Sequence, residues 1–429
     1  MDTLISEVIG GLTLVLLVAA LFAALARRCG QPAVVGQIVA GLVLGPSVLG
    51  RVPGHPISRL LPAASIPTLT VLAQIAVALF MFAVGYELDL RTLRQRRRAP
   101  VAVAVSALLV PMALGCLTVV LFRRWFVALG RTDFNAGYVL YLGIAMSITA
   151  LPVLAAILRE RGIAGTSVGV TATAAAGIMD VVAWLVLAAV LVGATHQAGR
   201  PWIVTLALLL GFLAVLRFAV RPALRWWMRR RAAVLSNKLL TAVVLALGSA
   251  WATASLGLHP IFGAFAAGLI MPRENGVPDP EVLRPVEDLS ALLLPLFFTV
   301  TGLSLNIESM NGAAFFVLAL VLIVSVGGKL CSAYTASRLS GLRPDEAAQI
   351  AALVNTRGLT ELIALNIGLS AGLIGPRLFA ALVIMALFTT LMTAPLLTAV
   401  RARCATPTGE SVVLKAPDVS ARTSRGFGR

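Results

Sequence analysis

The chain has 429 residues, of which 59% are hydrophobic and only 12% are charged, and its mean hydropathy is +0.95. Soluble domains average about 45–50% apolar and about 25% charged residues, so this composition excludes a soluble globular protein. The formal net charge of +17 would suit a nucleic-acid binder, but nearly all of the basic residues lie between apolar runs. We therefore interpret the chain as an all-α, polytopic membrane protein that does not bind nucleic acid.

Apolar runs that could cross a bilayer as helices follow one another along the chain, and we count about thirteen. The second and the ninth are short and rich in glycine. The predicted spans cover residues 8–26, 33–50, 67–88, 100–122, 136–158, 167–194, 202–220, 236–257, 260–272, 288–304, 312–336, 347–370 and 378–400. The membrane domain is therefore predicted to cover residues 1–400. Residues 401–429 are polar and basic, which predicts a short disordered cytoplasmic tail.

The basic residues gather in alternate loops. Arg27 and Arg28, "RTLRQRRR" at 91–98 and "RPALRWWMRRR" at 221–231 all fall on one side of the predicted membrane. Loops rich in Lys and Arg remain in the cytoplasm. We therefore predict a multi-pass protein of the cytoplasmic membrane, with the amino terminus outside and the carboxyl terminus in the cytoplasm.

Two pairs of segments resemble each other at an offset of about 220 residues. "LFMFAVGYELDL" (Leu79–Leu90) resembles "LFFTVTGLSLNI" (Leu296–Ile307), and "AGLVLGP" (Ala40–Pro46) resembles "AGLIMP" (Ala267–Pro272). The charge-derived topology places the two members of each pair in opposite orientations. This arrangement is typical of transporters with inverted-topology repeats. We predict such repeats over roughly residues 30–195 and 236–400.

The 167–194 span carries one charged side chain, Asp180. A charge at the centre of a membrane helix costs about 2.5–3.5 kcal/mol on insertion scales, so an acid there indicates a function. An apolar environment disfavours a bare carboxylate, and carboxylate, hydroxyl and carbonyl oxygens suit Na⁺ or K⁺. Asp180 is therefore predicted to bind a proton and a cation in turn.

Two other spans are interrupted. In "AMSITALPVL" (Ala145–Leu154), Pro152 has no N–H for the carbonyl of Ile148, while Ser147 and Thr149 supply hydroxyl groups. An ordinary proline kink would also explain this pattern. In "LVNTRGLTEL", the apolar run is broken by Asn355, Thr356, Arg357, Gly358 and Glu361. Irregular backbone at membrane depth is tolerated where protein or a water-filled cavity surrounds it, so both breaks are candidate parts of a site.

Lys329 lies about midway along the 312–336 span, in "SVGGKLCSAY". A lysine near a helix end could extend its ammonium to the membrane surface, but this position is too central for that interpretation. We predict a structural ammonium that pairs with helix carbonyls at the breaks, with Glu361, or with Asp180 when no cation is bound.

Collinear stretches across most of the membrane part resemble the monovalent cation:proton antiporter-2 family, which includes bacterial potassium-efflux antiporters and plant cation/proton exchangers. The matching stretches are "QPAVVGQIVAGLVLGPSVLG", "SITALPVLAAIL", "AAAGIMDVVAWLVLA", "GLHPIFGAFAAGLIMP", "LLLPLFFTVTGLSLNI" and "NTRGLTELIALNIG". The resemblance implies a homodimer, a core domain that moves against a dimerisation domain, and two helices that cross at unwound segments. It also implies that Asp180 is the proton/cation carboxylate and that Lys329 is a basic residue of the core. Electrogenic relatives usually place a second polar or acidic residue where this chain has Met179.

The favoured function is antiport of Na⁺ or K⁺ against protons by alternating access, with no cofactor and no enzymatic activity. The residue pattern does not choose between Na⁺ and K⁺. One alternative is an exporter of the same fold for a larger cation or an ion–ionophore complex that confers self-resistance. Another is an intramembrane aspartyl protease, which would need two facing carboxylates, with Asp180 and Glu361 as the candidates.

Overall fold

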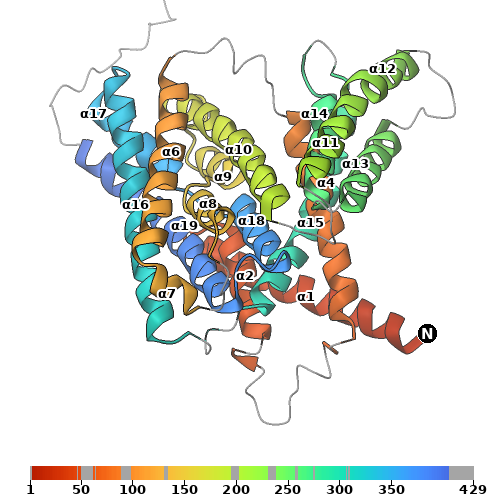
Figure 1. The fold of residues 1–429 in the computed structure, drawn as a ribbon, viewed down its shortest axis with the longest axis horizontal. Coiled ribbons are helices and arrows are strands. Elements are labelled where there is room, and N and C mark those ends of the chain that lie inside the picture. The colour runs from red at the N-terminus through yellow and green to blue at the C-terminus, as the bar shows by residue number, and fades with distance from the viewer. Residues whose placement is uncertain are drawn as a thin grey trace, which may run out of the picture.

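The fold is that of a computed structural model, which describes residues 2–45, 47–49, 61–62, 64–87, 98–129, 134–194, 202–229, 238–256, 259–273, 276–305, 307 and 310–404. Its regular elements within these ranges are helices (Figure 1). Nine of them are long and apolar enough to cross a bilayer, and three shorter apolar helices accompany them. The prediction of a polytopic helical membrane protein is confirmed.

The predicted tail begins too early. The last helix, α19 (Pro376–Cys404), continues past residue 400, because the apolar run before it carries the helix through the first basic residues. The remainder of the predicted tail, residues 405–429, lies outside the described part of the chain.

One set of helices, here called the scaffold group, packs together from two distant parts of the sequence. Its members are α1 (Asp2–Arg28), α2 (Ala33–Leu44), α4 (Ile66–Glu87), α13 (Lys238–Ser255), α14 (Pro260–Ile270) and α15 (Pro280–Leu303). In Figure 1, α4, α13 and α14 of this group lie at the right. The short helices predicted as the second and ninth spans, α2 and α14, are both here.

The remaining long helices form a second set, here called the crossing group. Its members are α6 (Arg98–Leu121), α8 (Ala136–Ala145), α9 (Leu151–Glu160), α10 (Ser167–Ala194), α16 (Gly312–Leu339), α17 (Pro344–Val354), α18 (Leu359–Ser370) and α19. They lie at the left of Figure 1. Short α7 (Arg123–Val127) follows α6, while α11 (Trp202–Val215), η2 (Leu216–Val220) and α12 (Arg221–Arg229) stand between the two groups in sequence.

Glycines bring scaffold helices into backbone contact. A Cβ at Gly41 of α2 would lie 2.1 Å from the Thr299 carbonyl oxygen of α15, and one at Gly268 of α14 would lie 2.1 Å from the Phe82 carbonyl oxygen of α4. Gly41 and Gly268 occupy matching positions in the two resembling segments, and so do Thr299 and Phe82. Small residues permit such close approach in membranes, where packing rather than hydrophobic burial holds helices together. The two halves of the chain therefore make matching contacts at matching positions.

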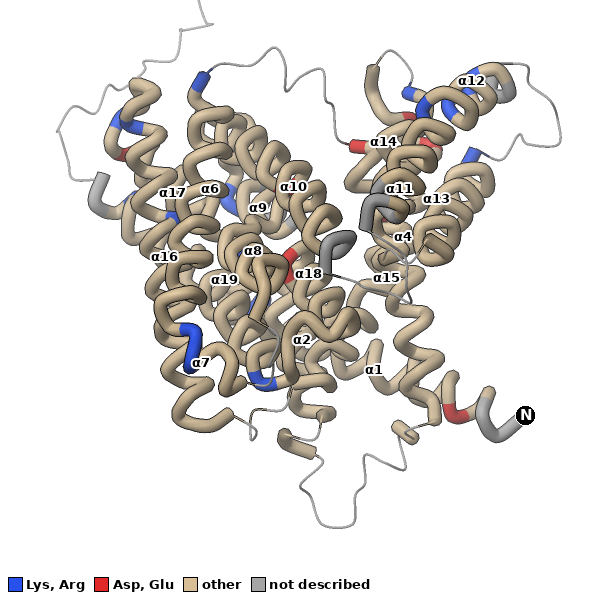
Figure 2. Tube along the Cα trace, viewed as in Figure 1, with Lys and Arg blue, Asp and Glu red and all other residues tan. Residues whose placement is uncertain are grey.

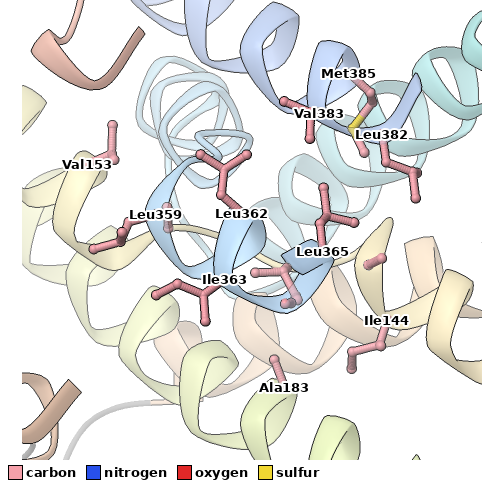
Figure 3. Close-up of a cluster of buried hydrophobic side chains, with 14 of the residues drawn as sticks. Ile144, Val153, Ala183, Leu359, Leu362, Ile363, Leu365, Leu382, Val383 and Met385 are labelled. Atoms are coloured by element: carbon pink, nitrogen blue, oxygen red, sulfur yellow. The ribbon is translucent and has the colours of Figure 1, made fainter. Parts of the chain in front are cut away.

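In the crossing group, α18 lies at the centre of a packed apolar cluster. Its buried side chains, among them Leu362 and Ile363, are surrounded by residues of α8, α9, α10 and α19, including Val153, Ala183 and Leu382 (Figure 3). Such interdigitation leaves few voids and fixes the position of a helix. The cluster therefore holds α18, and with it the break before α18, in a defined place.

Basic residues are concentrated at one end of the bundle, here called the basic end, where α6 begins at Arg98 and α12 ends (Figure 2). The end of α16 and the start of α17 lie at the same end and contribute Arg338 and Arg343. Fewer basic side chains mark the opposite end, near α7.

Candidate functional site

The two predicted breaks are separate pairs of half-helices that meet at their interruptions. The backbone N–H of Ala150, between α8 and α9, donates to the carbonyl oxygen of Thr356, between α17 and α18, at 3.0 Å. The hydroxyl of Thr149 donates to the carbonyl of Val354 at 3.0 Å, and that of Thr360 donates to the carbonyl of Thr149 at 3.3 Å. Each break therefore satisfies part of the backbone that the other exposes.

Local sequence explains where the half-helices start. Pro152 is the second residue of α9, where a missing N–H costs nothing because first-turn N–H groups have no helical partner. Gly358 precedes α18 with φ 156°, and a Cβ there would lie 2.7 Å from Cγ2 of Val153. Any larger residue at Gly358 would push the two breaks apart.

Two buried cations neutralise the carbonyl end of α8. The Lys329 ammonium donates to the carbonyls of Ser147 and Ile148, both at 2.6 Å. The Arg357 guanidinium donates to the carbonyl of Ala145 at 2.8 Å and to that of Met146. Both side chains are 0% exposed. A helix carboxyl end carries partial negative charge, so these buried cations stabilise it.

The oxygens that accept hydrogen bonds from Lys329 are thus helix carbonyls, which are one of the three kinds of partner predicted from the sequence. Glu361 instead pairs with Arg357 four residues earlier, with 2.8 Å between Oε1 and Nη1. An aspartyl protease would require Glu361 to face Asp180 as a free carboxyl partner. Its ion pair with Arg357 argues against that arrangement.

Asp180 is 3% exposed on α10. Neither carboxylate oxygen has a hydrogen bond of ordinary geometry among the described residues. The positive groups that act on it are the backbone N–H of Leu151, at the amino-terminal end of α9, and the ammonium of Lys329. A helix amino terminus favours an anion, so Asp180 is stabilised by the amino terminus of α9 and by the charge of Lys329 rather than by an ion pair. Its oxygens remain available to a proton or a cation.

The structure places the two predicted hydroxyl ligands beside the same break. Ser147 donates its hydroxyl proton to the carbonyl of Ile144 at 2.9 Å. The Thr149 hydroxyl, besides its bond to Val354, lies 3.7 Å from the sulfur of Met179, the residue before Asp180. The oxygens of both hydroxyls retain lone pairs, because donating a proton does not use them. Neither hydroxyl forms a hydrogen bond with Asp180 among the described residues.

The polar residues of the second break have different surroundings. Asn355 ends α17, and both polar atoms of its buried amide lack a partner among the described residues. Thr356 lies 3.5 Å from the hydroxyl of Thr393 on α19. Arg357 accepts a 2.7 Å hydrogen bond at its carbonyl from the Thr390 hydroxyl.

Sequence reasoning missed the threonines of α19, Thr390 and Thr393. Their signal is the polar pattern "TTLMT" within an otherwise apolar helix. It also missed Tyr141, whose hydroxyl donates to the carbonyl of Ala364 at 3.0 Å and ties α8 to α18.

Within the described ranges, no group of three or more His, Cys, Asp or Glu side chains could hold a metal ion. The groups predicted to bind the cation are the Asp180 carboxylate and the hydroxyl oxygens of Ser147 and Thr149. Such hard oxygen ligands suit alkali and alkaline-earth cations rather than transition metals.

One hydrogen bond and one aromatic contact join the crossing group to the scaffold group among the described residues. The Asn366 amide of α18 donates to the Thr301 hydroxyl of α15 at 3.0 Å. Trp184 of α10 meets Phe262 of α14 edge-to-face, with 6.0 Å between ring centroids. Asn366 and Trp184 both lie C-terminal to the site residues on their helices, towards the end of the molecule opposite the basic end.

A bundle of membrane-spanning helices with two crossing breaks and a buried carboxylate, Asp180, defines a membrane transporter with a polar site inside the bundle. Comparison with known proteins specifies the family. Residues 14–399 match the family described as "Sodium/hydrogen exchanger, transmembrane", so the chain belongs to that family. The antiporter resemblance found in the sequence is confirmed.

Two relatives and one solved structure illustrate the similarity. The chain is 35% identical to cation/H(+) antiporter 20 of Arabidopsis thaliana over 90% of its own length and 47% of that protein. It is 34% identical to the Na(+)/H(+) antiporter NhaS4 of Synechocystis over 91% of its own length and 96% of the relative. The chain thus spans about half the length of the plant relative but nearly all of the cyanobacterial one.

The sodium proton antiporter MjNhaP1 of Methanocaldococcus jannaschii has the same fold. The TM-score is 0.66 over 93% of this chain and 98% of that one, at 15% sequence identity. Identity this low supports the fold alone.

Proposed function

We propose that the chain exchanges a monovalent cation, Na⁺ or K⁺, for protons across the cytoplasmic membrane by alternating access. The observation that carries this proposal is Asp180, a buried carboxylate with no hydrogen-bond donor of ordinary geometry among the described residues. A fixed protein partner would compete with both proton and cation, whereas a carboxylate without such a partner can bind either one. The family and the antiporter names of the relatives support the same activity.

Asp180 is proposed to bind the proton and the cation in turn, with oxygens of Ser147 and Thr149 completing the cation's shell. Lys329 and Arg357 are proposed to keep α8 ended at Ala145 by compensating its carbonyls. Because the carbonyls take up both cationic groups, neither has to pair with Asp180. The carboxylate can therefore change its charge while the crossing stays intact.

Alternating access is proposed to arise from movement of the crossing group against the scaffold group. The matching glycine contacts, Gly41 with Thr299 and Gly268 with Phe82, support inverted repeats that close symmetrically around the scaffold. An inverted repeat supplies two related states of one structure, which is how such transporters open to either side. The amino terminus is proposed to lie outside, so that the basic end faces the cytoplasm.

In that orientation, the Asn366–Thr301 and Trp184–Phe262 contacts lie on the outer side of Asp180. They are proposed to close the outward path in the state described here and to separate in the alternate state. The homodimer implied by the family resemblance is proposed as the assembly in the membrane.

The test is cation-induced proton movement in proteoliposomes that contain the purified chain and an internal pH-sensitive dye. Internal pH is followed after addition of Li⁺, Na⁺, K⁺, Rb⁺ or choline at equal concentration. We expect a rapid, saturable pH change with Na⁺ or K⁺ and none with choline. Absence of a response to every alkali cation, in liposomes where the protein is shown to be folded and inserted, would contradict the proposal and favour export of a larger cation.

A further inference from the structure

A pocket opens at the basic end between the first turns of α6 and the last turns of α16, away from the crossing breaks. Its volume is about 540 Å³, and its lining includes Arg98, Ala102 and Ser106 of α6 with Thr335, Leu339 and Ser340 of the α16 end. The proposed exchange activity gives this pocket no role. The pocket is far larger than the roughly 30 Å³ that one water molecule occupies in the liquid.

The lining favours an anion. Among the described residues that line the pocket, Arg98 is the charged one and none is acidic. A guanidinium presents a planar fork of donors that matches phosphate oxygens. The amino terminus of α6 adds partial positive charge at the same place. The hydroxyls of Ser106 and Ser340 donate to the carbonyls of Ser332 and Ala336, so Arg98 and the Thr335 hydroxyl are the donors left for a ligand.

The pocket lies at the level where the membrane surface is expected. Helix α6 has 24 residues, which corresponds to about 36 Å, longer than the roughly 30 Å hydrocarbon core. Its first turn, which begins with Arg98, therefore lies at the level of the lipid headgroups. From Arg98 to Ser106 the pocket extends about 12 Å along the helix, which reaches from the phosphates into the acyl region.

Apolar side chains continue from the pocket along the outside of the bundle. Val101, Val105 and Leu109 of α6 are 41%, 48% and 47% exposed, and Leu339 of α16 is 85% exposed. Residues four apart share one face of a helix, so the three α6 residues form a continuous apolar stripe. A ligand with a phosphate in the pocket could lay hydrocarbon chains along this stripe.

We propose that this pocket binds the headgroup of an anionic phospholipid from the leaflet at the basic end. The phosphate contacts Arg98 and Thr335, and the acyl chains follow Val101, Val105 and Leu109. An anionic headgroup is favoured over choline or ethanolamine because the described lining offers a guanidinium and no carboxylate that could pair with a headgroup ammonium. A lipid held here anchors the start of α6, and therefore the crossing group, to the membrane surface.

The test uses delipidated, detergent-purified protein and measures the melting temperature with added phosphatidylglycerol, phosphatidylcholine or inorganic phosphate. Phosphatidylglycerol is expected to raise the wild-type Tm by about 2–4 °C more than phosphatidylcholine does. Arg98→Gln removes the charge, and Ala102→Phe fills the pocket while keeping the charge. Both variants should lose most of the phosphatidylglycerol-specific shift.

Arg338→Gln is the matched control, because Arg338 lies in the last turn of α16, beside the pocket, but does not line it. It should retain the full shift. Equal stabilisation by the two lipids, or a full shift in Arg98→Gln, would overturn the proposal. If Arg338→Gln loses as much of the phosphatidylglycerol-specific Tm shift as Arg98→Gln does, the lipid responds to surface charge in general and the proposal is wrong. If inorganic phosphate raises Tm as much as phosphatidylglycerol does, the pocket is a site for free anions rather than for a lipid. None of these readouts depends on transport.

Discussion

The scaffold group and the crossing group hold their helices together in different ways. In the scaffold group, helices meet backbone to backbone at glycines such as Gly41 and Gly268. In the crossing group, buried side-chain cations meet the carbonyls of broken helices at Ser147, Ile148, Ala145 and Met146. The first arrangement restricts the movement of one helix along the other, because each glycine packs directly against a carbonyl oxygen of the neighbouring helix. The second keeps irregular backbone stable beside a titratable carboxylate, which is what an exchange site requires.

Buried charge separates the two groups as well. Asp180, Lys329, Arg357 and Glu361 are buried in the membrane-spanning part of the crossing group. In the described part of the scaffold group, the buried acidic residue is Asp279, which lies just before α15 at the basic end. Substitutions that remove these features should therefore have different consequences in the two groups.

The largest loss of stability is expected for Lys329→Ala. Removing the ammonium leaves two buried carbonyls without their donor, which should cost about 3–5 kcal/mol by analogy with broken buried ion pairs. Lys329→Gln keeps one amide donor and should retain part of both stability and exchange. Melting temperatures and proteoliposome exchange would be measured together. If both variants are as stable as wild type and fully inactive, Lys329 takes part in the mechanism rather than holding the break.

The next largest effect is expected for Gly41→Ala or Gly268→Ala. Each new methyl group would meet a carbonyl oxygen at 2.1 Å, and overpacking of this kind costs about 1–3 kcal/mol. Gly327→Ala in α16 is the control, because its Cβ would meet nothing within 4 Å. The control should leave Tm unchanged or slightly raised, since alanine favours helix. Equal decreases in Tm in all three variants would show that the close glycine contacts do not stabilise the scaffold group more than an ordinary helix position does.

Much of this contrast was foreseeable from the sequence. A lone Asp180 in an apolar span and a mid-span Lys329 are costly enough in a bilayer to indicate function or structure without a fold. The two breaks were also predictable, because Pro152 and the "NTRG" stretch cannot continue an apolar helix.

What the sequence could not provide was the identity of partners between distant helices. Arg357 could have bonded to its own helix or to Asp180, but it reaches carbonyls of α8 more than 200 residues away. The requirement for Gly358 depends on Val153 from another helix, and the role of Thr390 depends on α19 lying beside the break. Such contacts follow from the packing of helices, which local propensity does not specify.

A smaller effect is expected at the contact between the groups. Thr301→Val removes the hydroxyl that accepts a hydrogen bond from Asn366, and one such bond contributes about 0.5–1.5 kcal/mol. If the bond closes the outward path, its loss should change the exchange rate while Tm falls little. Thr299→Val, two residues earlier on α15, is the control, because its hydroxyl bonds within the scaffold group to Gln37. An unchanged rate in Thr301→Val would remove this contact from the transport cycle.

The smallest effect is expected at the basic end of the scaffold. Burial raises the pKa of Asp279, but hydrogen bonds from Lys238 and from the Glu281 N–H outweigh it and hold the pKa below its usual 3.8. A lowered carboxyl pKa stabilises the fold above pH 3.8, and that stabilisation is lost as pH falls through the lowered value.

Asp279→Asn should therefore lower Tm by about 1–3 °C at pH 7, and its difference from wild type should shrink as the pH falls below about 4. Glu281→Gln is the control, because Glu281 pairs with the same lysine but its side chain is 75% exposed. It should change Tm less than Asp279→Asn does at every pH. A larger effect of the exposed partner would show that burial does not determine the strength of this pair.

The central claim is that Asp180 binds both the proton and the cation. The most direct test is Asp180→Asn in proteoliposomes, with the cation-induced pH change measured beside wild type at matched protein density. The amide has nearly the same shape but cannot ionise, so we expect wild-type insertion and thermal stability with no cation-dependent proton movement. Substantial exchange by a folded Asp180→Asn protein would contradict the account, because the proton would then have to travel on another group.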